Sequence, residues 1–301
     1  MKIKPFRRNT ATYSYNGVTY FLYHDKNSST EEVRRIIRRT MDNQIRVLSR
    51  LNKNTTVAAK LYNCGYFPNK ESTNFFFCTE YFTGGTLSDL ITGLSKEGTR
   101  LNEANCKRIF QELLSAVNSI HENNVAHLNL KPEHIMFNEK GELKLIGFQH
   151  SVITEAPKVR INTSNNGTCY NPPEFIFCAE PSFGEIKGHF KTRARGIRLI
   201  SGKSADVFSL GVILFLMYFG RCPFQKSDST DMSYMLIINE EYEKFWERVN
   251  EPVPKTLQML ITAMILYVPE ERLTIKEIFN HPWLSQEQNS TKKHEENIIL
   301  G

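Results

Sequence analysis

The sequence predicts an α+β protein with two lobes: a small β-rich N-terminal lobe with one helix, and a larger helical C-terminal lobe. Three observations predict it. Up to about residue 82, short stretches rich in aromatic residues indicate strands, and one long amphipathic stretch interrupts them. The pair Gly84-Gly85 then separates this part from the rest. Beyond it, apolar residues recur at helical spacing, and DVFSLGVILFLMYFG (206–220) is apolar enough for a buried central helix.

In the first lobe, TATYSYNGVTYFLYH alternates aromatic and polar residues around Asn16-Gly17, which predicts a hairpin. The stretch 28–52 carries apolar residues at helical spacing and predicts one amphipathic helix, with Gln44 on its apolar face. Two further strands are expected at 57–67 and 74–82.

In the second lobe, the pattern predicts helices and two short strands. We expect helices at 87–95, 104–124, 206–220, 255–265 and 274–284, and strands at 134–138 and 142–148. The expected organisation is an N-terminal lobe over 1–82, a C-terminal lobe over 83–286 and a polar, loose tail over 287–301.

Composition narrows the protein class. The chain has 301 residues, of which 40% are hydrophobic and 23% charged, and a mild net charge of +6, as expected of a soluble globular protein. Six scattered cysteines without a C-x-x-C pair favour reduced thiols over zinc or disulfides. The start lacks an apolar signal segment, and the longest apolar run, Leu210–Phe219, is too short to span a bilayer. We therefore expect a protein of the cytoplasm or nucleus, with no membrane span.

Five spaced motifs carry a family resemblance. They are HLNLKPEHIMF (127–137), LIGF (145–148), GTCYNPPEF (167–175), SADVFSLGVILF (204–215) and VPEERLTIKEIFNHPWL (268–284). In this order they resemble the catalytic loop, metal-binding loop, activation-segment end, central helix and final helices of a eukaryotic protein kinase. The resemblance covers about residues 10–285, and its C-terminal part is most similar to Ser/Thr kinases of the calmodulin-dependent type. It implies the bilobal protein-kinase-like fold.

The resemblance also marks the positions that should handle ATP, and their chemistry has changed. The glycine-rich loop is missing, since Gly17 is the only glycine before Gly65. Tyr23 stands at the phosphate-pairing lysine, Phe21 at the small residue against the adenine, and Gln44 at the helix glutamate. A phenol is neutral at pH 7 and does not replace an ammonium group.

The metal and base positions have changed as well. Gly147 stands at the metal-binding aspartate and His134 at the metal-binding asparagine, so neither offers the hard oxygen ligand that Mg²⁺ prefers. Asn129 replaces the catalytic aspartate, and its amide can orient a hydroxyl but not accept its proton. Lys131 is retained, and Lys60 is the nearby candidate for a relocated phosphate-binding lysine.

The resemblance further marks a nucleotide pocket, part of which has changed, and a set of structural residues that are kept. The nucleotide pocket is expected to include Phe21, Tyr23, Glu80, Phe82 and Met136. The expected structural residues are the ion pair Glu174 and Arg272, the loop-holding Asp206, and the spine residues His127, Phe148 and Leu48.

Together these positions predict a catalytically inactive pseudokinase, not an enzyme, that acts by protein binding as a scaffold or allosteric regulator. No cofactor is expected, neither Mg²⁺ nor bound ATP. Two alternatives stay open: a divergent Ser/Thr protein kinase with weak ATP binding or residual phosphotransfer, and a structural component of a larger assembly.

A protein partner is expected, either an active kinase or another protein with an acidic surface. The candidate contact residues lie in the basic stretch 184–203: Lys187, Lys191, Arg193, Arg195, Arg198 and Lys203. A second basic cluster, Arg34, Arg35, Arg38 and Arg39, lies on the lobe helix, where a solvated face explains it as well. Aromatic residues do not interleave with either cluster, so nucleic-acid binding is not supported.

Overall fold

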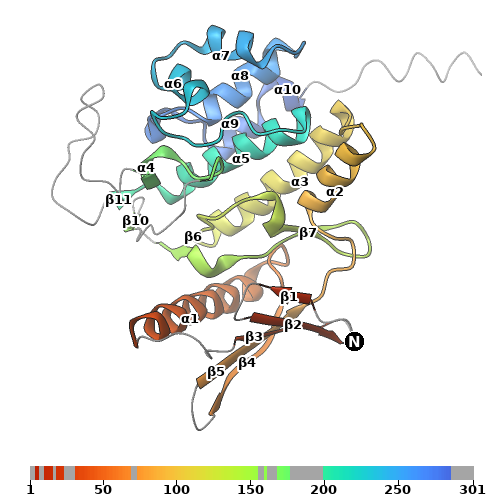
Figure 1. Ribbon diagram of the computed structural model, residues 1–301, viewed down its shortest axis with the longest axis vertical. Coiled ribbons are helices and arrows are strands. Elements are labelled where there is room, and N and C mark those ends of the chain that lie inside the picture. The colour runs from red at the N-terminus through yellow and green to blue at the C-terminus, as the bar shows by residue number, and fades with distance from the viewer. Residues whose placement is uncertain are drawn as a thin grey trace, which may run out of the picture.

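The computed structural model describes residues 4–6, 10–15, 18–23, 31–68, 73–154, 159–160, 168–176 and 199–285. Two lobes follow one another along the long axis of the molecule (Figure 1): a sheet with one long helix, and a larger group of helices. The predicted bilobal α+β fold is confirmed. The predicted lobe boundary at residues 82 and 83 falls in the link between the last strand of the sheet and the next helix.

The sheet of the first lobe has five antiparallel strands in the order β1-β2-β3-β5-β4. The strands are β1 (Lys4–Phe6), β2 (Thr10–Tyr15), β3 (Val18–Tyr23), β4 (Leu61–Pro68) and β5 (Thr73–Glu80). Strands β2 and β3 pair antiparallel with Tyr15 opposite Val18, as the predicted hairpin requires, while Asn16 and Gly17 themselves lie outside the described residues.

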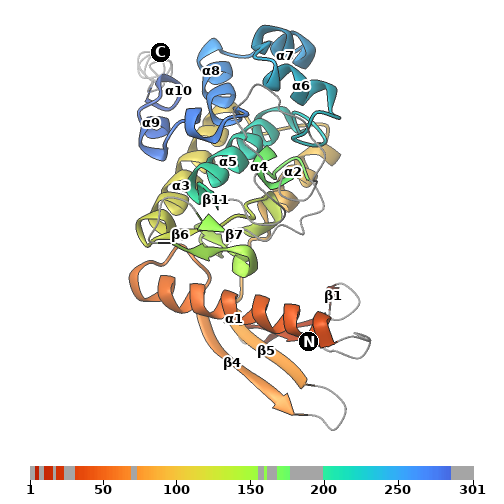
Figure 2. The ribbon, with the colours of Figure 1, turned by 90° about the vertical axis from the view of Figure 1, so that its left-hand side faces the viewer.

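Helix α1 (Glu31–Asn54) crosses between this sheet and the second lobe (Figure 2). Val47, Leu48 and Leu51 are buried, whereas Arg38 and Arg39 are exposed. The apolar stripe predicted from the sequence therefore faces the core. Because α1 packs against the short turn that follows Gly147, it connects the first lobe directly to the candidate site.

The second lobe begins with two helices and small strand pairs. The elements are α2 (Leu87–Lys96), α3 (Glu103–Glu122), β6 (Val125–Ala126), η1 (Pro132–His134), β7 (Ile135–Phe137), β8 (Leu143–Leu145), η2 (Phe148–His150), β9 (Val152–Ile153), β10 (Val159–Arg160) and β11 (Leu199–Ile200). The Thr86 side chain accepts from the backbone N–H of Asp89, and the Asp89 side chain accepts from Thr86, so a capping box begins α2. Strands β7 and β8 pair antiparallel and place the 127–137 loop beside the 145–148 segment.

The remaining helices surround α5. They are α4 (Pro173–Ile176), α5 (Gly202–Phe219), α6 (Met232–Ile238), α7 (Tyr242–Val249), α8 (Lys255–Met264), η3 (Pro269–Glu271), α9 (Ile275–Phe279) and α10 (Pro282–Ser285). Helix α5 begins four residues before the predicted start, because Ser201 accepts the Ser204 N–H as its N-cap. By length and composition α5 could cross a membrane, but 83% of it is buried, as in the core helix of a globular protein.

Two differences from the sequence prediction have simple causes. The segment 274–284 forms two short helices, α9 and α10, because Pro282 has no N–H to continue α9 and instead begins the next helix. Helices α6 and α7 were not predicted, and each spans fewer than nine residues, too short for periodicity to separate them from loops.

Candidate functional site

The loop that begins at His127 has its backbone held by Asp206, at the start of α5. The Asp206 side chain is fully buried. Its two oxygens accept from the backbone N–H groups of His127 and Leu128, each at 2.8 Å. Leu128 has a φ of +60°, a left-handed conformation that costs a non-glycine residue energy. The charge-assisted hydrogen bonds of Asp206 hold the loop in this conformation.

His127 connects this loop to the 145–148 segment. Its Nε2 lies 2.9 Å from the carbonyl oxygen of Ile146, and its ring centroid is 4.7 Å from that of Phe148. Burial lowers the pKa of His127, so the imidazole is neutral and donates from Nε2 to Ile146. Leu48 of α1 is buried in the same core as Phe148.

His134 and Gly147, the two metal-ligand positions of the resemblance, lie against each other. His134 donates from Nδ1 to the carbonyl oxygen of Asn129 at 2.8 Å. Burial, and next the electrostatic influence of the neighbouring His127 ring, lower the pKa of His134 to about 3, so the ring is neutral. Gly147 has a φ of +84°, and a Cβ built on it would lie 2.5 Å from His134 Nδ1. The imidazole therefore fills the space that a side chain at position 147 would need.

These two residues do not fit a magnesium ion. Mg²⁺ demands oxygen ligands in near-octahedral geometry. Gly147 offers no side chain, and the Nδ1 of His134 is already committed to the Asn129 carbonyl. Across the residues that the structure describes, no group of three or more His, Cys, Asp or Glu side chains forms a metal site.

Asn129, at the catalytic-aspartate position, is half-buried, and its backbone N–H donates to His127 Nδ1 at 3.3 Å. Lys131 follows it as the residue before the η1 turn and is also half-buried. The loop thus presents an amide and an ammonium group from neighbouring positions.

The remaining predicted positions lie in the first lobe, except for Met136, which lies in β7 of the second lobe. Phe21 and Tyr23 pair with Phe77 and Phe75 in the sheet register, while their side chains lie outside the described part. Gln44 is buried, with 9% of its surface exposed. Phe82 is buried and Met136 is half-buried. The Glu80 carboxylate accepts a hydrogen bond from the backbone N–H of Lys60 at 3.3 Å.

Lys60, the candidate for a relocated lysine, is exposed. Its Nζ lies 5.5 Å from the centroid of the Tyr62 ring, and Tyr62 is itself 48% exposed. A cation over an exposed ring gains only a small stabilisation. The Lys60 ammonium group therefore lies at the surface, beside the Tyr62 ring.

Glu174 and Arg272, predicted as a structural pair, form a bidentate ion pair with both N–O distances at 2.8 Å. Arg272 also donates to the carbonyl oxygens of Leu266 and Ser204, and its guanidinium lies 4.9 Å from the Phe208 ring centroid. The pair joins α4 to α5 and to the turn before α9.

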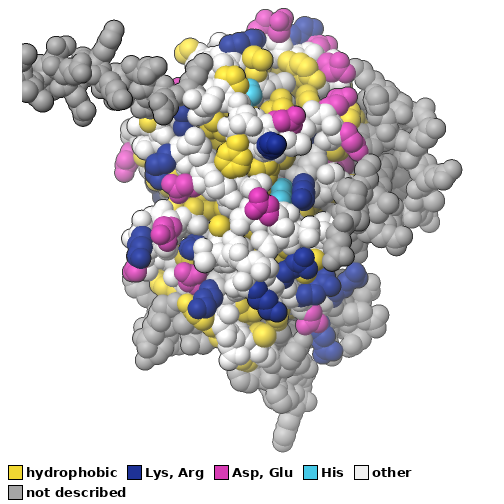
Figure 3. Space-filling model, turned by 180° about the vertical axis from the view of Figure 1, so that it is seen from behind, with side chains coloured by type: hydrophobic (Ala, Val, Ile, Leu, Met, Phe, Trp, Pro, Cys, Tyr) yellow, Lys and Arg dark blue, Asp and Glu magenta, His cyan; other side chains and the backbone are white. Residues whose placement is uncertain are grey.

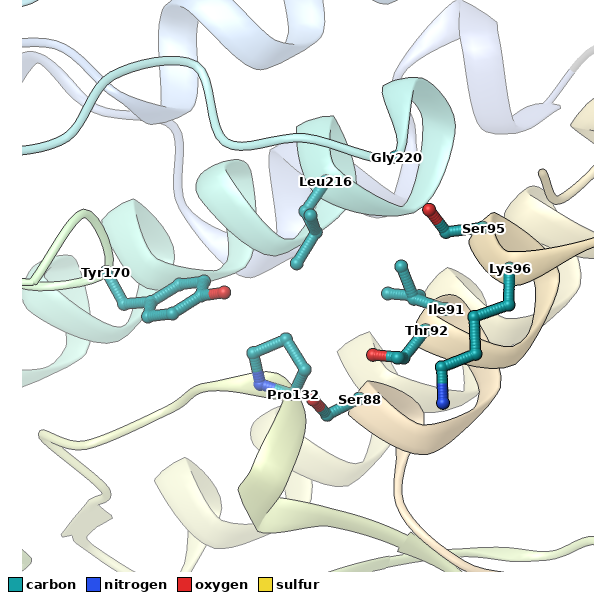
Figure 4. A pocket seen from close by; sticks show the side chains of 9 residues that line it. All are labelled: Ser88, Ile91, Thr92, Ser95, Lys96, Pro132, Tyr170, Leu216 and Gly220. Atoms are coloured by element: carbon teal, nitrogen blue, oxygen red, sulfur yellow. The ribbon is translucent and has the colours of Figure 1, made fainter. Parts of the chain in front are cut away.

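Two features of the site were missed in the sequence. Asn43 of α1 donates to the carbonyl oxygens of Ser151 at 2.7 Å and Gln149 at 3.3 Å, which fastens α1 to the segment after Gly147. The signal available in the sequence was the polar Asn43 beside the apolar stripe of the predicted helix. The second is a cavity of about 350 Å³ between α2 and α5, with Pro132 and Tyr170 in its wall (Figure 4).

Most of the predicted contact residues for a partner lie outside the described residues. Of those in the 184–203 stretch, Lys203 is described, and it is exposed in the first turn of α5. Arg38, Arg39 and Arg46 are exposed on α1, and Figure 3 shows Lys and Arg side chains gathered at the level of this helix. The partner remains a prediction.

Comparisons with known proteins agree with the fold. The family model described as "Protein kinase domain" matches residues 22–284. A maternal embryonic leucine zipper kinase of Xenopus tropicalis is 30% identical over 231 residues, which are 75% of this chain and 30% of that protein. Aurora kinase C of Mus musculus is 28% identical over 75% of this chain and 69% of its own length. CBL-interacting serine/threonine-protein kinase 13 of Arabidopsis thaliana is 29% identical over 76% of this chain and 40% of its own length.

These matches correct two expectations drawn from the sequence. The expectation that the chain is not an enzyme is wrong, because the domain match and the named Ser/Thr kinases point to an enzyme. The expectation of no ATP and no Mg²⁺ is wrong as well, since protein kinases transfer a phosphoryl group from ATP with Mg²⁺, although the side chains at positions 134 and 147 offer that ion no oxygen ligand. The physical reason is that the positioning of the reactants supplies much of the catalysis of phosphoryl transfer. Replacing individual residues therefore weakens the site but does not decide whether the chain is an enzyme. The chain belongs to the protein kinase family.

Proposed function

We propose that the chain is a divergent Ser/Thr protein kinase with weak nucleotide binding and residual phosphotransfer. The observation that carries this proposal is the intact backbone of the 127–137 loop, which Asp206 holds through two hydrogen bonds of 2.8 Å. A loop without function has no evident need for the unfavourable φ of Leu128. The relatives named as Ser/Thr kinases support Ser and Thr as the acceptor residues.

The proposed roles follow from the side chains present. The Asn129 amide orients the acceptor hydroxyl, whose proton passes to solvent water because an amide cannot accept it. Lys131 supplies positive charge at the loop. Losing a general base typically costs a factor of about 10²–10⁴ in rate, so we expect turnover lower by that factor than the roughly 1–100 s⁻¹ typical of kinases.

The test is transfer of labelled phosphate from ATP to a generic basic protein, with Mg²⁺ and with Mn²⁺. The matched variants are Lys131→Met in the loop and Lys140→Met at the exposed turn between β7 and β8. We expect weak transfer that falls at least tenfold in Lys131→Met and is unchanged in Lys140→Met. Absence of transfer would refute the proposal. Equal transfer in Lys131→Met and Lys140→Met would also refute it, because a contaminating kinase would then be the source.

The finer parts of the assignment remain proposals. A likeness to the calmodulin-dependent type rests on the HPW motif at 281–283. Binding of an acidic protein surface, such as that of an active kinase, is proposed for the basic stretch 184–203 in addition to catalysis, and supported by the exposure of Lys203. The comparisons favour the kinase over a purely scaffolding or structural role. For the whole protein the relatives are a partial guide, because the chain spans 30% of the Xenopus tropicalis relative.

A further inference from the structure

Two cysteine thiols from distant parts of the chain lie in contact in the second lobe. Cys169 precedes α4, and Cys222 follows Gly220 at the end of α5. Their sulfur atoms are 2.9 Å apart, although 53 positions separate them in the sequence. Neither thiol has a part in the proposed phosphotransfer.

The structure holds both segments so that the sulfurs face each other. The Ser209 hydroxyl of α5 donates to the carbonyl oxygen of Tyr170 at 2.8 Å. The buried Ser227 hydroxyl donates to the carbonyl oxygen of Asn171. Both neighbours of Cys169 on its C-terminal side are therefore fastened to the part of the lobe that contains Cys222. A sulfur–sulfur bond of about 2.05 Å requires an approach of less than 1 Å from the observed separation.

The two thiols differ in character. Cys169 is buried with 8% of its surface exposed, whereas Cys222 is half-buried and more open to solvent. The hydrogen bond from the Cys169 thiol, and in addition the Tyr170 hydroxyl, lower the pKa of Cys222. Burial of Cys222 and the charge of Glu133 act in the opposite direction. For Cys169, the hydrogen bond to Cys222 and burial raise the pKa. Cys222 is therefore the nucleophile of the pair, and Cys169 the resolving thiol.

We propose that Cys169 and Cys222 form a reversible disulfide in response to peroxide. The Cys222 thiolate attacks hydrogen peroxide, the O–O bond breaks, and with one proton the products are a Cys222 sulfenic acid and water. The Cys169 sulfur then displaces the hydroxyl of the sulfenic acid. That hydroxyl leaves with the Cys169 proton as a second water, and the S–S bond forms. Sulfur is oxidised and peroxide oxygen is reduced.

The bond joins the segment before α4 to the end of α5, next to the candidate site. Figure 4 shows the Tyr170 ring, adjacent to Cys169, in the wall of the cavity that Pro132 of the 127–137 loop also lines. A covalent link at Cys169 therefore restricts the motion of the wall that faces the loop. The inference does not depend on phosphotransfer, because its readouts are covalent mass and melting temperature.

The experiment uses the full chain with Cys178→Ser, since Cys178 lies outside the described residues and is the nearest competing thiol in sequence. The protein is treated with a small excess of hydrogen peroxide, digested without reduction and analysed by mass spectrometry. We expect loss of two hydrogen masses, one linked peptide pair that contains Cys169 and Cys222, and reversal by dithiothreitol. The melting temperature should rise by about 5 °C on oxidation, because the bond closes a long loop in the unfolded chain.

Matched variants separate the pair from general oxidation. Cys222→Ser should abolish the link and the rise in melting temperature, whereas Cys64→Ser, at a half-buried free cysteine of β4, should leave both unchanged. Cys169→Ser should abolish the link in the same way. If Cys169→Ser does not fold, the Cys222→Ser variant and the linked peptide of the parent chain still decide the question. A link of either cysteine to a different partner, or stable sulfinic acid without a link, would overturn the proposal.

Discussion

At the scale of single residues, the neutral imidazole of His134 is the most informative group of the site. Burial, and next the neighbouring His127 ring, lower its pKa to about 3, while the hydrogen bond to the Asn129 carbonyl acts in the opposite direction. In the unfolded chain an exposed histidine titrates near 6.5. Between these two values the unfolded state binds one more proton than the folded state, so stability rises with pH across this range.

The first prediction follows from this sign. As pH falls from 7.5 to 5.0, His134 should contribute a loss of about 2 kcal/mol in the free energy of unfolding, because the unfolded histidine gains a proton that the folded one does not. The variant His134→Asn should lose about that much less stability over the same range. Urea unfolding of both proteins at the two pH values measures the difference. An equal pH dependence in both proteins would contradict a His134 that stays neutral in the folded state.

The second prediction concerns the space that His134 fills. Gly147→Ala should cost about 1–2 kcal/mol for its positive φ and about 1–3 kcal/mol more for the contact with the imidazole. Gly141→Ala is the matched control, since Gly141 has a φ of +78° and no atom within 4 Å of the added Cβ. It should show the first cost alone.

Adding His134→Ala to Gly147→Ala tests whether the contact is the cause. Removing the ring also removes its own packing, so the double variant is compared with His134→Ala by itself, and the difference should fall to the Gly141→Ala value. Urea unfolding measures the free energy of unfolding of each variant. Costs that are the same for Gly147→Ala with and without His134 would show that the imidazole does not fill this space.

At the scale of elements, the Glu174–Arg272 pair connects α4 to α5 and the late helices. Its side chains are at most 1% exposed, and the two N–O contacts are 2.8 Å each. In such a position the ion pair adds little net stability over apolar residues, but a single remaining charge is costly. The pair therefore makes the arrangement of these elements sensitive to loss of either partner.

The third prediction is that Arg272→Met destabilises the chain by about 3–5 kcal/mol, since it leaves Glu174 buried without its partner. The double variant Glu174→Gln/Arg272→Met should recover part of this loss. Glu112→Gln, which breaks the exposed Arg108–Glu112 pair of α3, is the control and should cost about 0.5 kcal/mol or less. Urea unfolding of the parent chain, Glu174→Gln, Arg272→Met and the double variant forms the cycle, and strict additivity of the two single changes would refute the coupling.

At the scale of the whole molecule, nucleotide binding should appear as a small stabilisation. For a dissociation constant of about 1 mM, 5 mM ATP adds about 1 kcal/mol to the free energy of unfolding. For a chain of this size the melting temperature should then rise by about 1–2 °C. A thermal-shift titration with ATP and Mg²⁺ measures the rise, with inorganic triphosphate as the control for charge alone. No rise at 10 mM ATP, or an equal rise with triphosphate, would contradict weak nucleotide binding.

The sequence by itself determined the order of the elements and the identity of the site positions. Periodicity predicted α1 and α5, the Asn16-Gly17 pair predicted the β2–β3 hairpin, and the 127–137 motif placed Asn129 and His134 in one loop. These signals are local, because propensity, turn chemistry and residue spacing act within a few positions of the chain.

Contacts between distant positions were decided by the tertiary structure. The sequence did not show that the His134 imidazole occupies the space beside Gly147, that Asn43 fastens α1 to Ser151, or that Cys169 meets Cys222. The members of these pairs are separated by 13, 108 and 53 positions. No local pattern encodes such contacts, because they exist only once the lobes have packed and the backbone has brought the segments together.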